Sequence, residues 1–192
     1  MKLYDISQEV FSCTVYPGDP EPEKVMLYST DNADLYNLSS FAMCAHNGTH
    51  IDAPFHFLGD GKTVDQMDLS IFVGNCFVAR HEGDVTAMDA EAIMLRANGV
   101  ERILIGGNIT VTAEAAEVFA AHRIKLIGNE GPTVGPENAP MQVHTILLRQ
   151  EIALLEGIVL QEVPEGQYFL NAAPLNLAGS DGAPCRAYLI ET

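Results

Sequence analysis

Three short apolar segments, separated by stretches rich in Ala and Glu, constrain the fold of this chain more than any other feature of its sequence. Residues 71–80, 102–105 and 124–127 are rich in β-branched, aromatic and other apolar side chains, a composition that favours buried strands. The stretches between them have the composition of helices. This alternation predicts β-α-β units, and therefore an α/β fold in which helices pack against a sheet.

Both intervening stretches also carry signals for the ends of helices. Thr86 begins a capping-box pattern before a helix expected at residues 90–97, and Gly99 is placed to end that helix. Thr112 is suited to cap a second helix that runs to about Arg123. Composition and capping therefore agree on two strand-helix-strand repeats.

The rest of the chain adds strands outside these units. A Pro- and Gly-rich cluster at residues 16–22 predicts a rigid loop. Because no repeat, low-complexity tract or long linker is present, we expect residues 1–192 to form a single domain with a central mixed β assembly flanked by helices. Further strands are expected near residues 2–7, 25–29, 36–45, 153–160, 168–172 and 186–190, and a further helix near 143–151.

Charge and composition exclude several classes of function. With 10 Lys and Arg against 26 Asp and Glu, the formal charge of -16 would repel nucleic acid over most of the surface. No apolar run is long enough for a membrane span, and no secretion signal is recognised, so a cytoplasmic protein is expected. Cys13, Cys44, Cys76 and Cys185 form no Cys-x-x-Cys pair, which predicts reduced and mostly buried thiols.

A cluster of polar side chains between residues 46 and 56 is the strongest indication of chemistry. His46, His50, Asp52 and His56 supply the neutral nitrogen and anionic oxygen donors that divalent metals bind. Chance clustering is the alternative to a metal site. His81 and His122 do not lie in such a cluster of metal-ligand residue types, and we interpret them as ordinary surface or packed histidines.

The spacing in this segment restricts its conformation. Gly48 and Pro54 oppose a helix, and the Glu that a helical metalloprotease motif needs after the first His is missing. A fully extended strand from residue 46 to residue 56 would span roughly 33 Å, too far for ligands of one ion. The chain must therefore bend, and Asn47-Gly48 and Ala53-Pro54 permit turns, so a tight, irregular ligand loop is expected.

The pattern His46-x-Gly48-Thr49-His50-x-Asp52-x-Pro54-x-His56 resembles the signature of the metal-dependent cyclase/hydrolase family, which includes bacterial kynurenine formamidase and isatin hydrolase. The similarity extends to the Tyr16-Pro17-Gly18-Asp19 turn and to residues 60–74. His144 and Glu156 resemble the distal metal ligands of that family. The resemblance therefore covers nearly the whole chain.

The resemblance implies a swivelling β/β/α fold, commonly in homo-oligomers such as a homodimer. It also implies a Zn²⁺ site with two ions per subunit, although Mn²⁺ stays open because imidazole and carboxylate suit both metals. One ion would be held by His46, His50 and Asp52, and the other by Asp52, His144 and Glu156. His56 would be the unligated acid/base, working with a metal-bound hydroxide.

The function implied is that of an amidohydrolase acting on a small-molecule amide, with arylformamidase, which cleaves N-formyl-kynurenine, as the first expectation. An isatin hydrolase-like enzyme or another cyclic amide or ester hydrolase is the first alternative, and a lyase or a non-catalytic metal- or ligand-binding domain is the alternative of another class. Tyr16 stands where kynurenine formamidases commonly carry a Trp, and it is either a substrate contact or a packed loop aromatic. In the loop 129–135, which departs from the family pattern, we expect a structural role for Glu130.

Overall fold

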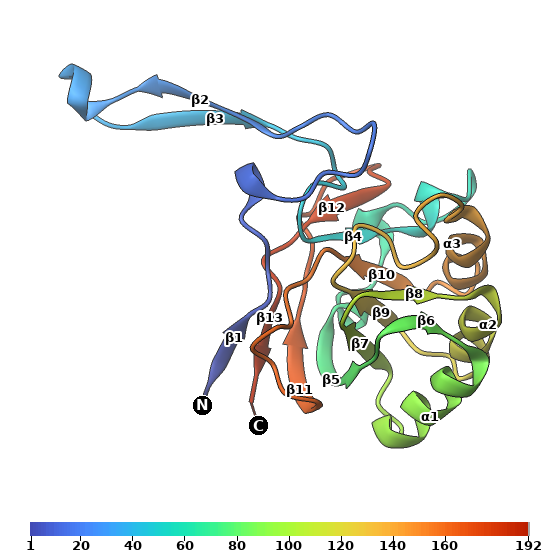
Figure 1. Cartoon of the computed structure of the whole chain (residues 1–192). Coiled ribbons are helices and arrows are strands. Elements are labelled where there is room, and N and C mark those ends of the chain that lie inside the picture. The colour runs from blue at the N-terminus through green and yellow to red at the C-terminus, as the bar shows by residue number, and fades with distance from the viewer. Residues whose placement is uncertain (192) are drawn as a thin grey trace.

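The computed structural model describes residues 1–191, and its centre is a nine-stranded mixed sheet (Figure 1). The sheet curls, so that strands from the two ends of the chain lie at one edge and the His-rich segment lies at the other. In spatial order its strands are β1 (Leu3–Asp5), β13 (Tyr188–Ile190), β11 (Gly166–Asn171), β5 (Val73–Arg80), β7 (Arg102–Gly106), β9 (Leu126–Asn129), β10 (Ala153–Glu156), β4 (His50–Asp52) and β12 (Gly182–Pro184).

The four strands β5, β7, β9 and β10 are parallel neighbours, whereas the outer strands pair antiparallel. Three helices connect these parallel strands and lie together on one side of the sheet (Figure 1). They are α1 (Ala87–Ala97), α2 (Ala113–Ala121) and α3 (Met141–Leu148). The predicted β-α-β units and mixed α/β fold are thus confirmed.

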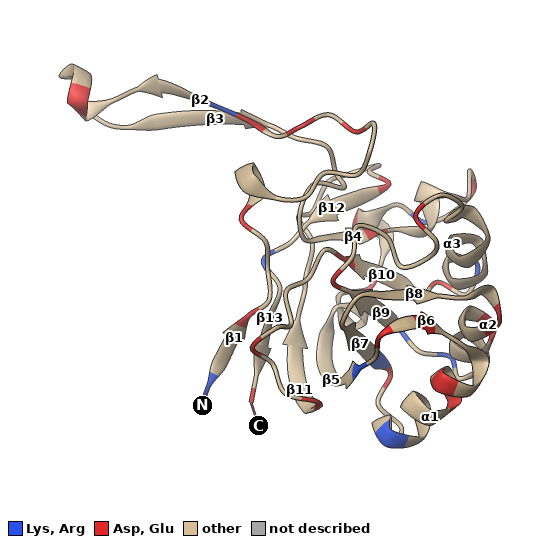
Figure 2. Cartoon of the chain, viewed as in Figure 1, with Lys and Arg blue, Asp and Glu red and all other residues tan. Residues whose placement is uncertain are grey.

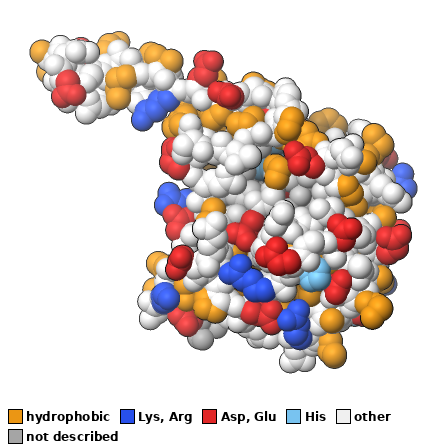
Figure 3. Space-filling model, in the orientation of Figure 1, with side chains coloured by type: hydrophobic (Ala, Val, Ile, Leu, Met, Phe, Trp, Pro, Cys, Tyr) orange, Lys and Arg blue, Asp and Glu red, His pale blue; other side chains and the backbone are white. Residues whose placement is uncertain are grey.

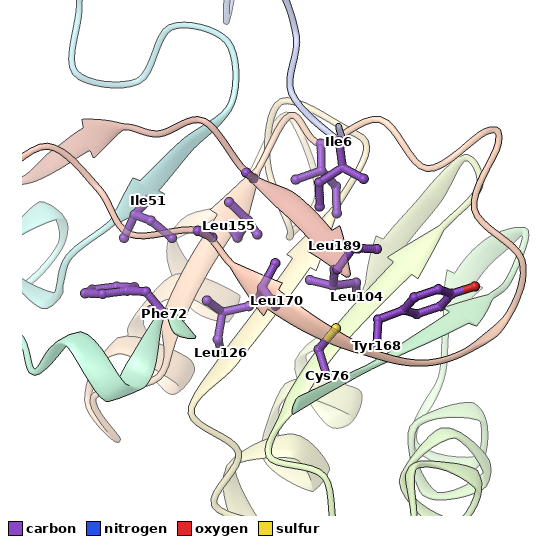
Figure 4. Packing of buried hydrophobic residues seen from close by; sticks show 14 of the residues in the cluster. Ile6, Ile51, Phe72, Cys76, Leu104, Leu126, Leu155, Tyr168, Leu170 and Leu189 are labelled. Atoms are coloured by element: carbon purple, nitrogen blue, oxygen red, sulfur yellow. The ribbon is translucent and has the colours of Figure 1, made fainter. Parts of the chain in front are cut away.

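Alternation along the strands divides the core into two layers. In β7, Ile103 and Ile105 pack with the helices, whereas Leu104 points to the opposite face. The second layer lies on the concave side of the curled sheet and includes Phe72 and Tyr168 (Figure 4). Both faces of the central strands are buried, which explains why their sequences are continuously apolar.

The helix ends show one confirmation and one correction. Thr86 forms the predicted capping box of α1, accepting a hydrogen bond from the Asp89 backbone. The C-terminal cap, however, is Asn98 with a φ of 51°, and Gly99 only follows it. Asn tolerates the left-handed conformation because its short polar side chain interacts locally, so the helix ends at Ala97 as predicted but is stopped by Asn98 rather than by Gly99.

Several short elements were not predicted, because three residues are too few to show a period. These are β4, β12, and the parallel pair β6 (Gly83–Val85) and β8 (Ile109–Val111). Short 3-10 helices span Val10–Ser12, Thr30–Asn32, Pro54–His56, Val64–Gln66 and Leu69–Ile71. The strand expected over residues 153–160 ends at Glu156, because Gly157 turns the chain with a φ of 67°.

A hairpin of β2 (Glu23–Tyr28) and β3 (Leu38–Ala42) projects away from the rest of the molecule (Figure 1). Every residue of its two strands is exposed. The two chain ends lie side by side elsewhere, through pairing of β1 with β13. Within residues 1–191, none of the helices has the length and apolar character needed to cross a bilayer.

The cysteines are all free in the described part of the chain. Only Cys76 is fully buried, and Cys13, Cys44 and Cys185 are partly exposed. The prediction of mostly buried thiols therefore holds, because none of the four is fully exposed and Cys185 packs against the core.

Candidate metal centre

The pairing of β4 with β10 builds the floor of the site. His50 lies directly opposite Glu156 in this antiparallel register, and directly opposite residues share a face of the sheet. Asp52 is two residues further along β4 and therefore on the same face. His50 Nε2 lies 3.6 Å from Glu156 Oε2 and 3.3 Å from Asp52 Oδ1. A histidine and two carboxylates thus meet at the end of a buried strand pair.

The expected irregular ligand loop is only partly correct, because β4 is a regular strand between two bends. The first bend is held by Asn47, which is buried and whose side-chain Oδ1 accepts a hydrogen bond from the Cys44 backbone. Gly48 supplies a φ of 65° and Thr49 donates to the Gly157 carbonyl. The second bend is the 3-10 helix Pro54–His56. The predicted turns therefore stand, whereas the strand between them was missed.

The distal histidine comes from a helix. His144 lies on α3, and its Nδ1 donates to the Pro140 carbonyl at 3.0 Å. His50 Nδ1 similarly donates to the Gly48 carbonyl at 2.9 Å. Since a carbonyl oxygen can only accept, Nδ1 carries the hydrogen in both rings, and Nε2 points toward the carboxylates. Metal-ligating imidazoles are oriented in this way, by a hydrogen bond from the nitrogen that does not bind the metal.

Asp52 is the centre of the cluster. Its side chain is 1% exposed, and its Oδ1 lies 2.8 Å from His46 Nδ1. Its Oδ2 faces His144 Nε2 at 3.4 Å and His56 Nε2 at 4.0 Å. Among the described residues, this Oδ2 is buried without a hydrogen-bond partner. An orphaned buried carboxylate oxygen is costly, and a cation among these donors would satisfy it.

Two overlapping groups offer one ligand atom per residue, with all atoms of a group within 4.8 Å of one another. One group is His46, Asp52 and His56, and the other is His50, Asp52 and Glu156. Imidazole nitrogen and carboxylate oxygen suit divalent cations of intermediate softness. The residues present therefore fit a metal centre built around Asp52.

The electrostatics of the cluster lead to the same conclusion. Burial opposes a charge on His46 and His144, but the carboxylates outweigh it and raise the pKa of His46 to about 9 and of His144 to about 10. Burial also opposes a charge on Asp52, yet the histidines, His144 first, hold the pKa of this carboxyl well below its usual range. Protons thus supply the positive charge that a bound cation would supply instead.

His56 differs from its neighbours in exposure. Its side chain is 28% exposed, and its ring lies 4.1 Å from that of His46, centroid to centroid. Burial lowers the pKa of His56, so the ring is mostly neutral near pH 7. A neutral, partly exposed imidazole beside the cluster is chemically suited to accept and return a proton.

Asp181 is a residue of this site that sequence reasoning missed. Its Oδ2 lies 2.7 Å from His46 Nε2 and 3.3 Å from His56 Nδ1. The pairing of β12 with β4 brings it there, 125 residues from His56 along the chain. The Ser-Asp-Gly sequence around Asp181 indicates only a loop, and nothing in its spacing connects it to the histidines.

A cavity of about 400 Å³ opens above the cluster. Tyr16, Phe57 and Thr133 line it together with the histidines and Asp181. The Tyr16 hydroxyl donates to the Glu137 carbonyl at 2.6 Å, so this loop aromatic is both fixed and in contact with the cavity. His122, by contrast, pairs with Glu91 on the surface away from the cavity.

The loop 129–135 closes one side of the site. The Val134 backbone donates to Glu156 Oε1 at 2.7 Å and thereby orients that carboxylate. Glu130 instead accepts from the Gly107 backbone at 2.7 Å and the Leu160 backbone at 2.8 Å. Both oxygens of Glu130 are therefore occupied in holding loops, as expected of a structural residue.

Comparison with known proteins places this geometry in a family. The model of the Cyclase family matches residues 4–136, which include the whole His-rich segment. The chain belongs to the Cyclase family. A relative of this Cyclase-family chain, the kynurenine formamidase of Erythrobacter litoralis (strain HTCC2594), is 32% identical over 204 residues, covering 99% of this chain and 94% of the relative.

Solved structures show the same fold. A protein described as a potential metal-dependent hydrolase with cyclase activity is 28% identical and superposes with a TM-score of 0.84, covering 98% of this Cyclase-family chain and 96% of the other. Isatin hydrolase A from Labrenzia aggregata, bound to benzyl benzoate, has a TM-score of 0.85 at 18% identity, with coverage of 100% and 94%. The expected fold of the family is confirmed.

Proposed function

We propose that this chain is a metal-dependent amidohydrolase, and that it is an arylformamidase that converts N-formyl-kynurenine and water to kynurenine and formate. The observation that carries this proposal is the buried Asp52 carboxylate, ringed by imidazoles at the floor of a cavity. Full-length similarity to a kynurenine formamidase supports the substrate.

The proposed metal is Zn²⁺, with two ions per subunit that share Asp52. His46 and His50 would complete one site, and His144 and Glu156 the other. A divalent cation held by these residues would lower the pKa of a water molecule towards 7 and would stabilise the negative charge that develops on an amide carbonyl oxygen. The short distances between Asp52 and all three histidines support this sharing, because each falls between 2.8 and 3.4 Å.

The chain's own residues would then handle the proton. His56 lines the cavity, and Asp181 accepts a hydrogen bond from its Nδ1, which fixes the orientation of the ring. Cleavage of the amide needs a proton on the leaving amine nitrogen, and a neutral imidazole that has first accepted a proton can return it there. We assign His56 as the acid/base and Asp181 as its positioning residue.

Tyr16 and Phe57 support an aromatic substrate. Both line the cavity, and a ring between them would be held by apolar and edge contacts. The Tyr16 hydroxyl is bound to the Glu137 carbonyl, so it presents its ring rather than its hydroxyl. We propose that Tyr16 takes the place of the stacking Trp that this chain does not have.

Isatin-like lactams are the second candidate, favoured by the close fold similarity to isatin hydrolase A. Both reactions add water to an amide carbonyl, so the cluster serves either. The outcome depends on whether the cavity prefers an open-chain formamide or a fused ring. A cytoplasmic location is also proposed, because the cysteines of the described chain are free thiols, as is usual in a reducing compartment.

Parallel assays separate these candidates. Zinc-loaded protein is offered N-formyl-kynurenine and isatin at equal concentrations, and the products are identified by mass. We expect formate and kynurenine in equal amounts, with isatin opened at least tenfold more slowly. Faster opening of isatin would replace the first substrate with the second. A product that lacks the added water would instead indicate a lyase and overturn the hydrolase proposal.

A further inference from the structure

The hydroxyl of Thr133 is a buried polar group that the mechanism outlined above does not use. Thr133 is only 7% exposed, and it lines the cavity of about 400 Å³ above the Asp52 cluster. Within residues 1–191, its Oγ1 is buried without a hydrogen-bond partner. A buried hydroxyl without a partner destabilises a protein, and a ligand bound in the cavity is one source of that partner.

Hydrogen bonds hold the backbone on both sides of this hydroxyl. The Asn129 side-chain Nδ2 donates to the Thr133 carbonyl at 2.7 Å. The next residue, Val134, donates its backbone N–H to Glu156 Oε1 at 2.7 Å, and its carbonyl accepts from the Val111 backbone at 3.0 Å. Thr133 therefore stands on a fixed loop, one residue from a contact with a candidate metal ligand. A donor that is already held in place loses little freedom when a ligand arrives.

The same loop contains a second buried oxygen that lacks a partner in the described chain, Asn129 Oδ1. An amide oxygen can only accept a hydrogen bond, whereas a hydroxyl can donate one. The two groups would satisfy each other if the loop brought them together, and it does not. The donor capacity of Thr133 is therefore left for a group from outside the loop.

The other hydroxyl and the thiol of the cavity wall already have partners. The Tyr16 hydroxyl donates to the Glu137 carbonyl at 2.6 Å. The Cys44 Sγ lies 3.8 Å from Asp19 Oδ2, within reach of a hydrogen bond from its thiol. Neither group is free to donate to a substrate without giving up a contact.

The imidazoles of the cavity wall are engaged as well. The two ring nitrogens of His46 lie 2.8 and 2.7 Å from carboxylate oxygens. His50 and His144 each donate Nδ1 to a backbone carbonyl and direct Nε2 toward the carboxylates. His56 is the residue proposed to protonate the leaving nitrogen. None of these rings is left to donate to the oxygen of an amide carbonyl.

Cationic side chains do not take this role either. The described residues that line the cavity include no Lys or Arg, and Figure 2 shows none on β4, β10 or β12. Acidic side chains are instead spread over the face of the molecule that Figure 3 shows, in keeping with the formal charge of -16. Negative charge that develops on a carbonyl oxygen is stabilised by donors placed beside it. Among the side chains of this described wall, the Thr133 hydroxyl is the neutral donor that is still free.

We propose that Thr133 donates a hydrogen bond to the carbonyl oxygen of the amide that this site cleaves. The inference rests on the amidohydrolase function proposed above. Because Thr133 already lines the cavity, contact between its hydroxyl and a substrate needs at most a rotation about χ1 to another staggered position. The oxygen becomes more negative as water adds to the carbonyl, so the hydrogen bond strengthens in the transition state and acts on kcat more than on KM.

Two substitutions at this position separate the hydroxyl from the shape of the side chain. Thr133→Val removes the hydroxyl and should lower kcat at least about tenfold, with KM changed less than about threefold. Thr133→Ser keeps the hydroxyl and should keep kcat within about threefold of wild type. The substrate is whichever of N-formyl-kynurenine and isatin the wild type hydrolyses. Zinc content, measured by mass spectrometry of the intact protein, should be the same in all three proteins.

Stability gives a readout that needs no turnover. Since the Thr133 hydroxyl has no partner in the described chain, Thr133→Val should keep or raise the Tm of the substrate-free protein. Thr112→Val is the matched control, because the Thr112 hydroxyl caps α2 by accepting from the Ala115 backbone at 3.2 Å. That variant should lower the Tm and leave kcat unchanged.

The outcomes distinguish the inference from the function on which it rests. Wild-type kcat in Thr133→Val, or a loss of kcat that Thr133→Ser shares, would overturn the inference and leave the amidohydrolase function standing. A fall in Tm of Thr133→Val as large as that of Thr112→Val would reveal a structural role for the hydroxyl and would also overturn it. Absence of turnover of both amides by metal-loaded wild type would refute the proposed function, and the inference with it.

Discussion

Four imidazole rings surround one carboxylate in this protein, and their unequal distances agree with the different roles proposed for them. His46, His50 and His144 lie within 3.4 Å of Asp52, whereas His56 stands 4.0 Å away and is the most exposed of the four. The close histidines are suited to hold a cation beside Asp52. His56, the distant one, is the residue proposed for proton transfer.

Asp181 gives a test of orientation at the residue scale. Asp181→Asn should lower kcat about tenfold, with little change in KM or metal content. This is part of the roughly 10²–10⁴-fold rate enhancement that a positioned general acid/base contributes. The carboxylate favours protonated His56, so its removal should also lower the pKa of His56 and shift the pH-rate profile to lower pH. A full steady-state pH profile provides the measurement.

Asp60→Asn, at an exposed carboxylate outside the cavity, is the control for this experiment and should change neither kcat nor the profile. If Asp181→Asn reduced only the amount of folded protein and left the profile of the remainder unchanged, the positioning role would be wrong.

Cys76 gives a second prediction at the residue scale. Burial under the sheet raises the pKa of this thiol to about 12, so almost none of it is thiolate at pH 8. Iodoacetamide should therefore leave Cys76 unmodified in the native protein and alkylate it on unfolding. Mass spectrometry of peptides reads this out, with the partly exposed Cys13 as internal control. Equal modification of both cysteines in the native state would contradict the packing of this layer.

At the scale of elements, the site depends on where β4 and β10 end. Glu156 is the last residue of β10, and Gly157 then turns the chain at a φ of 67°. A Cβ on Gly157 would lie 2.6 Å from the Gly48 carbonyl oxygen, in the turn that positions His46. The turns next to His46 and Glu156, two of the candidate ligands, are thus packed directly against each other.

Gly157→Ala should lower the free energy of unfolding and weaken metal binding together. The left-handed φ costs about 1–2 kcal/mol, and the clash adds roughly 1–3 kcal/mol. Gly179→Ala is the matched control, with a φ of 75° but no heavy atom of the described chain within 4 Å of its added Cβ. The free energies of unfolding of the two variants, measured with urea, should differ by at least about 1 kcal/mol. Equal losses of unfolding free energy in the two variants would show that the contact between Gly157 and Gly48 is not rigid.

The elements also show what the sequence could and could not predict. The long apolar strands and both capped helices were predicted because periods and caps extend over many residues. The three-residue strands β4 and β12 were not, since their pairing is decided by contacts distant in sequence. Asp181 was missed for the same reason, whereas the motif between His46 and His56 is compact enough to be visible as a pattern.

At the scale of the whole molecule, the sheet brings together candidate metal ligands from both halves of the chain. The His-rich segment and the distal pair of His144 and Glu156 meet only because β4 pairs with β10 and α3 packs beside β10. Asp52 and Glu156 are both buried there. Folding therefore concentrates negative charge, which a cation would neutralise. That residues 1–192 form one domain stays a prediction.

Metal removal should accordingly destabilise the protein. At zinc concentrations a hundredfold above the dissociation constant, binding contributes about 2.7 kcal/mol, or roughly 5–10 °C in Tm for a chain of this size. Thermal scans with zinc and after chelation should show this difference. In Asp52→Asn, which has nearly the same shape but no charge, the difference should disappear. An equal effect of zinc on wild type and Asp52→Asn would place the metal elsewhere.

Hydrolysis of N-formyl-kynurenine by metal-loaded protein, followed by kynurenine absorbance, tests the central claim most directly. We predict turnover that is lost on chelation and restored by zinc. His56→Ala should keep its metal yet lose at least a hundredfold in kcat, the lower range for a general acid/base. His122→Ala, at a surface histidine, should behave as wild type. No turnover by protein shown to hold metal would contradict the substrate, and loss of metal in His56→Ala would contradict the division of roles.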